Sequence, residues 1–151
     1  MSAPRWPDLA GRITGRVHVL AVRVYYEDTD FSGAVYHANY LKFCERGRSD
    51  FLRLIGVHHH ELNAADPPLG FVVRRMACEF LRPAAIDDVL QVRTEVAAAT
   101  GARLILRQRV LRDGEELFRA EVTAALVDAT GRPRRLPQEL RDKLAPFTPR
   151  E

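Results

Sequence analysis

Cysteine is scarce in this chain of 151 residues, which contains only Cys44 and Cys78 and no CxxC pair. Both cysteines lie among apolar neighbours, a setting typical of buried free thiols and not of a disulfide framework or a zinc site. The run His58-His59-His60 does not replace such a site, because three consecutive residues cannot all face one ion on regular structure. The sequence therefore predicts free thiols and no metal site.

Long apolar runs are also missing. No stretch approaches the roughly 20 apolar residues that a helix needs to cross a bilayer. Near the N-terminus, the apolar middle that a signal peptide requires is interrupted by Pro4, Pro7, Asp8 and Arg12. We therefore expect a cytoplasmic protein that is not an integral membrane protein.

Lysine is nearly absent as well. Lys42 and Lys143 are the only two among 23 basic residues, and 20 acidic residues reduce the net charge to +3. The basic residues are scattered among acidic ones, without a run of five. Since nucleic-acid-binding proteins gather positive charge into a patch or stripe, we predict no nucleic-acid partner.

Proline is absent from residues 36–55, and this segment has the spacing of one long helix. Its apolar and small positions recur at steps of four and three residues, which places on one helix face Tyr40, Cys44, Gly47, Phe51 and Leu54. Gly56 is a natural C-terminal stop. Because Gly47 destabilises a helix interior by roughly 1 kcal/mol relative to alanine, we expect a sheet to approach closely there.

Alternating apolar residues predict strands on both sides of this helix. One strand begins at Val17, with Leu20, Val22, Val24 and Tyr26 on one face. Four more stretches follow the helix, at about residues 70–82, 89–98, 104–111 and 118–126, and Asp113-Gly114 is a hairpin turn signal. Residues 57–69 form a polar loop or short helix, and residues 137–144 a short terminal helix. The order predicts an α+β fold with one long helix on an antiparallel sheet.

Residues 24–48 read VYYEDTDFSGAVYHANYLKFCERGR. This segment closely resembles the 4-hydroxybenzoyl-CoA thioesterase family, and within it the short acyl-CoA thioesterases associated with the bacterial Tol–Pal envelope system. The likeness continues from Val22 to Pro137, with Phe31-Ser32 where the family more often has alanine or proline and a small residue. It implies a hotdog fold, in which a five-stranded antiparallel sheet wraps one long central helix. We expect a flexible arm at residues 1–16, one domain at 17–145 and a tail at 146–151.

The resemblance also implies an activity, the hydrolysis of short-chain or aromatic acyl-CoA to free acid and coenzyme A without a cofactor. It assigns the catalytic carboxylate to Asp30, as nucleophile or as general base, and no chemical role to Asp28. The backbone amides of Tyr36 and His37, at the positive end of the helix, would bind the oxyanion. The His37 side chain is a second catalytic candidate, Asn39 would hold the loop, and Gly33 would contact substrate. Hotdog subunits pair, so the resemblance further implies a homodimer or homotetramer, with a peripheral association with the envelope system.

Several of these residues have simpler interpretations. Asp30 is also a suitable N-cap or turn residue, and Glu45 suits an ion pair with Arg46 or Arg48. Arg74 and Arg75 match the geometry of coenzyme A phosphates, or belong to a solvated strand face. The alternative functions are a non-catalytic acyl-binding or envelope-system partner protein and a hotdog hydratase or dehydratase.

Overall fold

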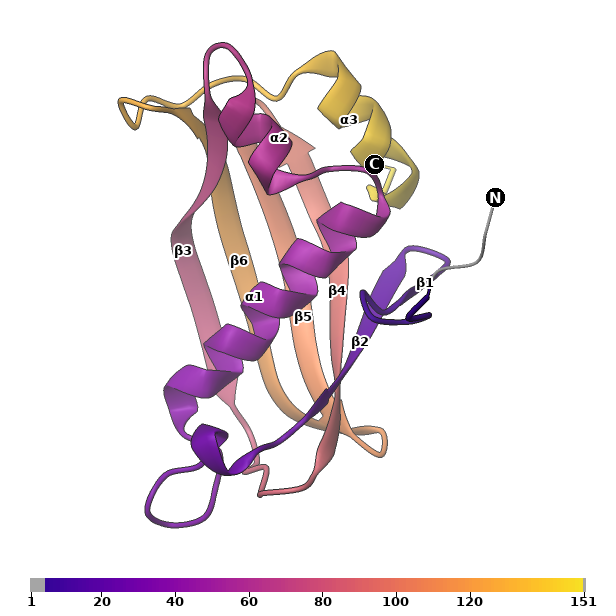
Figure 1. Ribbon diagram of the computed structural model, residues 1–151, viewed down its shortest axis with the longest axis vertical. Helices are drawn as coiled ribbons and strands as arrows, with labels where there is room; N and C mark the ends of the chain where they lie inside the picture. The colour runs from indigo at the N-terminus through magenta and orange to yellow at the C-terminus, as the bar shows by residue number, and fades with distance from the viewer. Residues whose placement is uncertain (1–4, 151) are drawn as a thin grey trace.

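The computed structural model describes residues 5–150, which form one six-stranded antiparallel sheet with a long helix lying across one face (Figure 1). The elements are, in chain order, β1 Arg12–Thr14, β2 Val17–Arg23, α1 His37–Leu54, α2 His59–Ala64, β3 Leu69–Phe80, β4 Val89–Thr100, β5 Arg103–Arg112, β6 Glu115–Asp128 and α3 Gln138–Leu144. Short 3₁₀ turns occupy Tyr26–Asp28 and Ala145–Phe147. The strand order is β1-β2-β4-β5-β6-β3. This is the hotdog arrangement, and the expected α+β class is confirmed.

Helix α1 packs mainly on β2, β4 and β5 through the face that the sequence spacing predicts (Figure 1). Tyr40, Cys44, Gly47 and Phe51 are all buried. The predicted position of Leu54 on this buried face is wrong. Leu54 is 44% exposed, because the helix ends at this residue and the chain turns away at Gly56. The predicted inward position of Tyr26 is also wrong, since the chain leaves the sheet after Arg23 and enters a 3₁₀ turn.

Gly47 lies where the sheet comes closest to α1. A Cβ at this position would lie 2.8 Å from Val92 Cγ1, 3.1 Å from Thr94 Oγ1 and 3.2 Å from Gln108 Nε2. The buried Gln108 side chain donates hydrogen bonds to the Cys44 carbonyl, at 2.9 Å, and to Thr94 Oγ1, at 2.8 Å. The predicted close approach is therefore confirmed, although sheet side chains and not sheet backbone fill the space.

The sheet has six strands and not the expected five, because the segment predicted as an N-terminal arm contributes β1. Residues Arg12–Thr14 pair with Val17–Val19 of β2. The buried His18 ring is anchored beside this hairpin, with Nε2 2.7 Å from the Ala10 carbonyl oxygen. Three residues are too few for alternation to reveal a strand. The first four residues of the predicted arm lie outside the described residues.

The part of the chain that packs onto the core extends beyond the predicted end of the domain, into the residues expected to form a tail. The Phe147 ring, inside the expected tail, meets the buried Phe51 edge to face at 5.6 Å between centroids. Leu140 and Leu144 of α3 are buried in the same core cluster. Within residues 5–150, no helix combines the length and the apolar character needed to cross a membrane.

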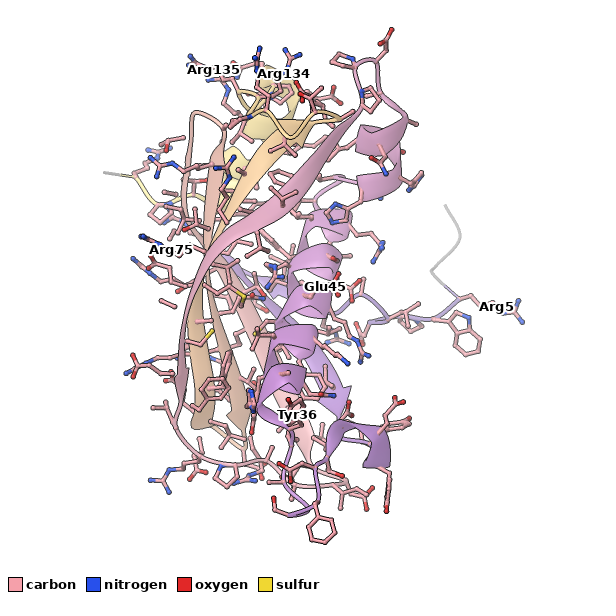
Figure 2. All side chains as sticks on the ribbon, turned by 90° about the vertical axis from the view of Figure 1, so that its left-hand side faces the viewer. Arg5, Tyr36, Glu45, Arg75, Arg134 and Arg135 are labelled. Carbon is pink, nitrogen blue, oxygen red and sulfur yellow. The ribbon has the colours of Figure 1, made fainter. Side chains whose placement is uncertain are left out.

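The two edges of the sheet differ in length and composition. At one edge, β1 has 3 residues, whereas β3 at the other has 12 and, among residues 5–150, pairs only with β6. Val72 and Val73 in the middle of β3 are 43% and 47% exposed, and Arg74 lies at a register shift, between Val73 and Arg75. Figure 2 looks onto this edge, along which β3 runs uncovered in front of the sheet.

Candidate active site

The acidic loop before α1 is held in place by its first aspartate. Asp28 is buried, and its Oδ2 accepts a 2.8 Å hydrogen bond from the Tyr25 amide. Its Oδ1 accepts a 2.9 Å hydrogen bond from the side-chain amide of Asn39, one turn into the helix. Asp28 therefore joins the loop to the start of α1, and the predicted role of Asn39 in holding the loop is confirmed.

Residues 29–35 form a tight hairpin that projects Asp30 into solvent. Thr29 and Val35 form a bridge, and the Asp30 amide donates to the Ala34 carbonyl at 2.9 Å. The Gly33 amide donates back to the Asp30 carbonyl at 3.0 Å. Gly33 has a φ of +87°, in the left-handed region that side chains disfavour. The glycine is thus explained by the turn itself.

The two carboxylate oxygens of Asp30 are not equivalent. Oδ1 accepts hydrogen bonds from the Ser32 hydroxyl at 2.5 Å and from the Ser32 amide at 2.8 Å. No group among residues 5–150 donates to Oδ2. The Ser32 hydroxyl, then the Ser32 amide, lower the pKa of Asp30, desolvation opposes them, and the charge of nearby His37 adds to the lowering. Asp30 is therefore an exposed, ionised carboxylate with one oxygen free to react.

Asp30 does not cap the helix, so the N-cap interpretation is wrong. Tyr36 occupies the N-cap position and forms no side-chain capping bond. The turn interpretation describes the backbone correctly, since the carboxylate bonds to the amide two residues further on. That bond occupies Oδ1 and leaves Oδ2 available for chemistry.

The positive end of α1 begins at His37, beside this loop. The Tyr36 amide donates to the Asp28 carbonyl at 2.9 Å, so the prediction that it binds an oxyanion is wrong in this structure. Across the described chain, no acceptor is found for the amides of His37 and Ala38. These are the orphan donors of the first helical turn, where the helix dipole is positive. The free amides at the start of α1 are thus one residue further along the chain than the predicted pair.

Aromatic side chains cluster at the start of α1, where the free amides lie. The His37 ring lies 4.5 Å from the Tyr36 ring and 6.1 Å from the Phe80 ring, between centroids. Phe80, 51% exposed, meets the buried Phe118 at 5.0 Å, and Phe118 stacks on Tyr40 at 5.2 Å. Phe80 was not singled out by sequence reasoning as a site residue, because only the register of β3 brings it beside a helix 43 positions earlier in the chain.

Arg74 and Arg75 lie in a different region. With Arg103 they line a surface hollow of about 740 Å³, whose other walls are Thr100–Ala102, Thr123, Ala125 and Pro133. Neither forms an ion pair within the part of the chain that the structure describes. Arg75 projects from the sheet away from α1 (Figure 2). It is five residues from Phe80, about 17 Å along a strand, so one protomer does not place these arginines at Asp30.

Two further sequence expectations concern Glu45 and the histidine run. Glu45 accepts a 3.3 Å hydrogen bond from Ser49, and Arg48 donates to Gln108 Oε1 at 3.0 Å, so the expected ion pair with Arg46 or Arg48 is not formed. In the histidine run, α2 begins at His59. The described residues contain no cluster of His, Cys, Asp or Glu suited to a metal ion.

The thiols differ in exposure. Cys44 is buried and Cys78 is half-buried, and both are free. Burial raises the pKa of the Cys44 thiol to about 12, and burial also raises the pKa of Cys78. Neither thiol is therefore a reactive thiolate at neutral pH.

Comparison with known proteins identifies relatives over most of the chain. Residues 24–144 match the model of the thioesterase-like superfamily. An acyl-CoA thioester hydrolase, YbgC, from Escherichia coli is 42% identical over 79% of this chain and 89% of its own length. The acyl-CoA thioesterase YbgC of Haemophilus influenzae is 44% identical over 71% and 78%. The crystal structure of a probable thioesterase from Bartonella henselae superposes with a TM-score of 0.78 at 46% identity, covering 80% of this chain and 99% of that one.

Proposed function

Because this chain belongs to the thioesterase-like superfamily, we propose that it hydrolyses acyl-CoA thioesters of short-chain or aromatic acids to the free acid and coenzyme A. One observation carries the proposal. Asp30 presents a free, ionised carboxylate oxygen close to a helix N-terminus with two unpaired amides. A negative group and an oxyanion-binding site are the two parts that thioester hydrolysis requires.

The chemistry follows from the position of each group. The thioester carbonyl oxygen accepts hydrogen bonds from the His37 and Ala38 amides, which stabilise the negative charge that develops on it. Asp30 Oδ2 then either adds to the carbonyl carbon, expelling the thiolate and leaving an anhydride that water cleaves, or takes a proton from a water that adds there. We propose that the His37 imidazole, whose ring lies 6.1 Å from that of Phe80 between centroids, donates a proton to the departing thiolate.

We propose that the working unit is a homodimer joined through β3. A long edge strand with exposed valines is a template for pairing, and most soluble homo-oligomers are two-fold symmetric. Antiparallel pairing about the middle of β3 would bring the Phe80 end of one strand to the Leu69 end of its partner. Each Asp30 site would then be completed by the partner subunit.

Pairing of two subunits through β3 also suggests a role for Arg74 and Arg75. We propose that Arg74 and Arg75, which have no acidic partner in the described chain, hold the phosphates of coenzyme A, since guanidinium groups suit phosphate geometry. From the middle of β3 they are about 17 Å from the Phe80 ends of both strands, so an extended coenzyme A arm can connect them to the reactive centre. Assembly of dimers into a tetramer and a peripheral association with the cell envelope remain predictions from the resemblance, and a cytoplasmic location remains a prediction from the lack of long apolar runs.

Asp30→Asn tests this proposal. Asparagine keeps the size and the Ser32 hydrogen bonds but loses the charge that both chemical routes require, so thiol release from an acyl-CoA panel should fall below about a tenth of wild type. The matched control is Asp113→Asn, an exposed aspartate in the β5–β6 turn with a φ of 51° that asparagine tolerates. Asp28→Asn is unsuitable, because Asp28 is buried and its Oδ2 accepts from an amide. Activity above a tenth with an unchanged melting temperature would remove Asp30 from the mechanism.

A further inference from the structure

The Ser32 hydroxyl lies at the centre of the loop that carries Asp30. It donates to Asp30 Oδ1 at 2.5 Å and accepts from the Ala34 amide at 3.4 Å. The Ser32 amide donates to the same oxygen at 2.8 Å. Two donors from one residue thus hold Oδ1, while the hairpin backbone fixes the residue that supplies them.

A carboxylate at the tip of an exposed loop rotates freely unless a neighbour holds one oxygen. Asp30 is exposed, and the adjacent Phe31 is fully exposed. Its orientation therefore depends on Ser32. Among the described residues, the hydroxyl is the one side-chain group that bonds to Asp30.

We infer that Ser32 is a positioning residue for Asp30, which holds Oδ1 so that Oδ2 faces the thioester carbonyl. The inference rests on the proposed function, because it concerns the same carboxylate. Ser32 itself does not contact the reacting atoms. Its effect is exerted through the orientation and the proton affinity of Asp30.

The charged groups near Asp30 indicate in which direction loss of the Ser32 hydroxyl would change the pKa of Asp30. His37, at the start of α1, is the charged residue that acts on the Asp30 carboxylate, and it stabilises the ionised form. On the neighbouring loop, which bridges to the hairpin through Ala34 and Ala85, Asp88 is paired with Arg112 at 2.7 Å. Hydrogen bonds to a carboxylate favour its charged form. Loss of the Ser32 hydroxyl therefore raises the pKa of Asp30 toward that of an ordinary aspartate.

Ser32→Ala tests the inference through the pH profile of the reaction. We expect kcat at neutral pH to fall about 10- to 100-fold, the scale on which small misplacements of a catalytic group reduce rate. KM should change little, since the lost interaction orients the carboxylate and does not bind coenzyme A. The acidic limb of the kcat/KM profile should move to higher pH. Ser32→Thr, which keeps the hydroxyl, should restore both the rate and the limb.

The matched control is Thr29→Ala. The Thr29 hydroxyl donates to the Tyr26 carbonyl at 2.8 Å, in the same loop, and does not bond to Asp30. This variant loses a side-chain hydroxyl from the same loop and should keep the wild-type pH profile. Melting temperatures of all three variants separate a loss of folding from a loss of positioning.

Three outcomes would overturn the inference: an unchanged acidic limb in Ser32→Ala, an equal displacement of the limb in Thr29→Ala, or a rise in kcat when the hydroxyl is lost. Asp30→Asn, measured in parallel, distinguishes this failure from a failure of the proposed function. If Asp30→Asn is inactive while Ser32→Ala matches wild type, only the positioning role is wrong. If Asp30→Asn remains active, the catalytic assignment is wrong as well.

Discussion

The side-chain amide of Asn39 donates a 2.9 Å hydrogen bond to Oδ1 of Asp28, and both residues are buried. Two positions after Asp28, the Asp30 carboxylate faces solvent and, in the described chain, bonds only to Ser32. Two aspartates of one Asp-Thr-Asp motif thus have different functions. The first builds the junction between loop and helix, and the second is left available for chemistry.

Asn39→Ala should destabilise the protein, because it removes one of the two donors to the buried Asp28 carboxylate. An unsatisfied buried group of this kind costs about 1–3 kcal/mol of the free energy of unfolding. For a chain of this size the melting temperature should fall by about 3–10 °C. Thermal unfolding by circular dichroism measures the change, and Thr29→Ala, which loses an exposed hydrogen bond nearby, is the control. Equal melting temperatures for both variants would contradict the structural role of Asn39.

Gly47→Ala should also destabilise the fold, although alanine is the better helix former by roughly 1 kcal/mol. The new methyl group would lie 2.8 Å from Val92 Cγ1, closer than real contacts allow, and Val92 and Gln108 are completely buried. Overpacking typically costs about 1–3 kcal/mol, so the net loss should be near 1 kcal/mol. Urea unfolding measures this loss in the free energy of unfolding.

A double-mutant cycle separates crowding from other effects of Gly47→Ala. If Val92 causes the strain, Gly47→Ala should be less harmful in a Val92→Ala background, where the crowding methyl group is gone. Identical effects in both backgrounds would show that the contact with Val92 is not the cause.

Val73→Lys should yield a monomer. The substitution puts a charge in the middle of the exposed β3 edge, where two copies would face each other across the two-fold axis. Light scattering measures the mass, and activity should fall with it, since the proposed site needs both subunits. Val89→Lys, at a valine on β4 that is 51% exposed, should leave the mass unchanged. A dimeric Val73→Lys protein would place the interface elsewhere.

Arg75→Ala should raise KM for acyl-CoA more than it lowers kcat, because a phosphate contact made equally in the ground and transition states is uniform binding. The comparison substrate is an acyl thioester of pantetheine, which lacks the nucleotide. Steady-state kinetics on both substrates should show the penalty for acyl-CoA alone. A penalty of equal size on both would mean that Arg75 does not contact the nucleotide.

Local patterns in the sequence determined most of the architecture. The spacing of Tyr40, Cys44 and Phe51 predicted the buried face of α1, and the hairpin signal at Asp113-Gly114 corresponds to a turn in which both residues have positive φ. The resemblance at residues 24–48 identified the acidic loop and the family. These features depend on neighbours a few residues apart, so a single sequence contains them.

Only the tertiary structure decided which groups are free to act. The Tyr36 amide is occupied because the Asp28 carbonyl folds back to it, and the Asp30 carboxylate is oriented because the hairpin presents Ser32. Phe80 reaches His37 through the register of β3 on β6. Each of these contacts depends on the three-dimensional path of the backbone, and hydrogen-bond satisfaction is a property of that path. The sequence and its resemblance therefore predicted a candidate site, and the fold determined which of its atoms remain unpaired.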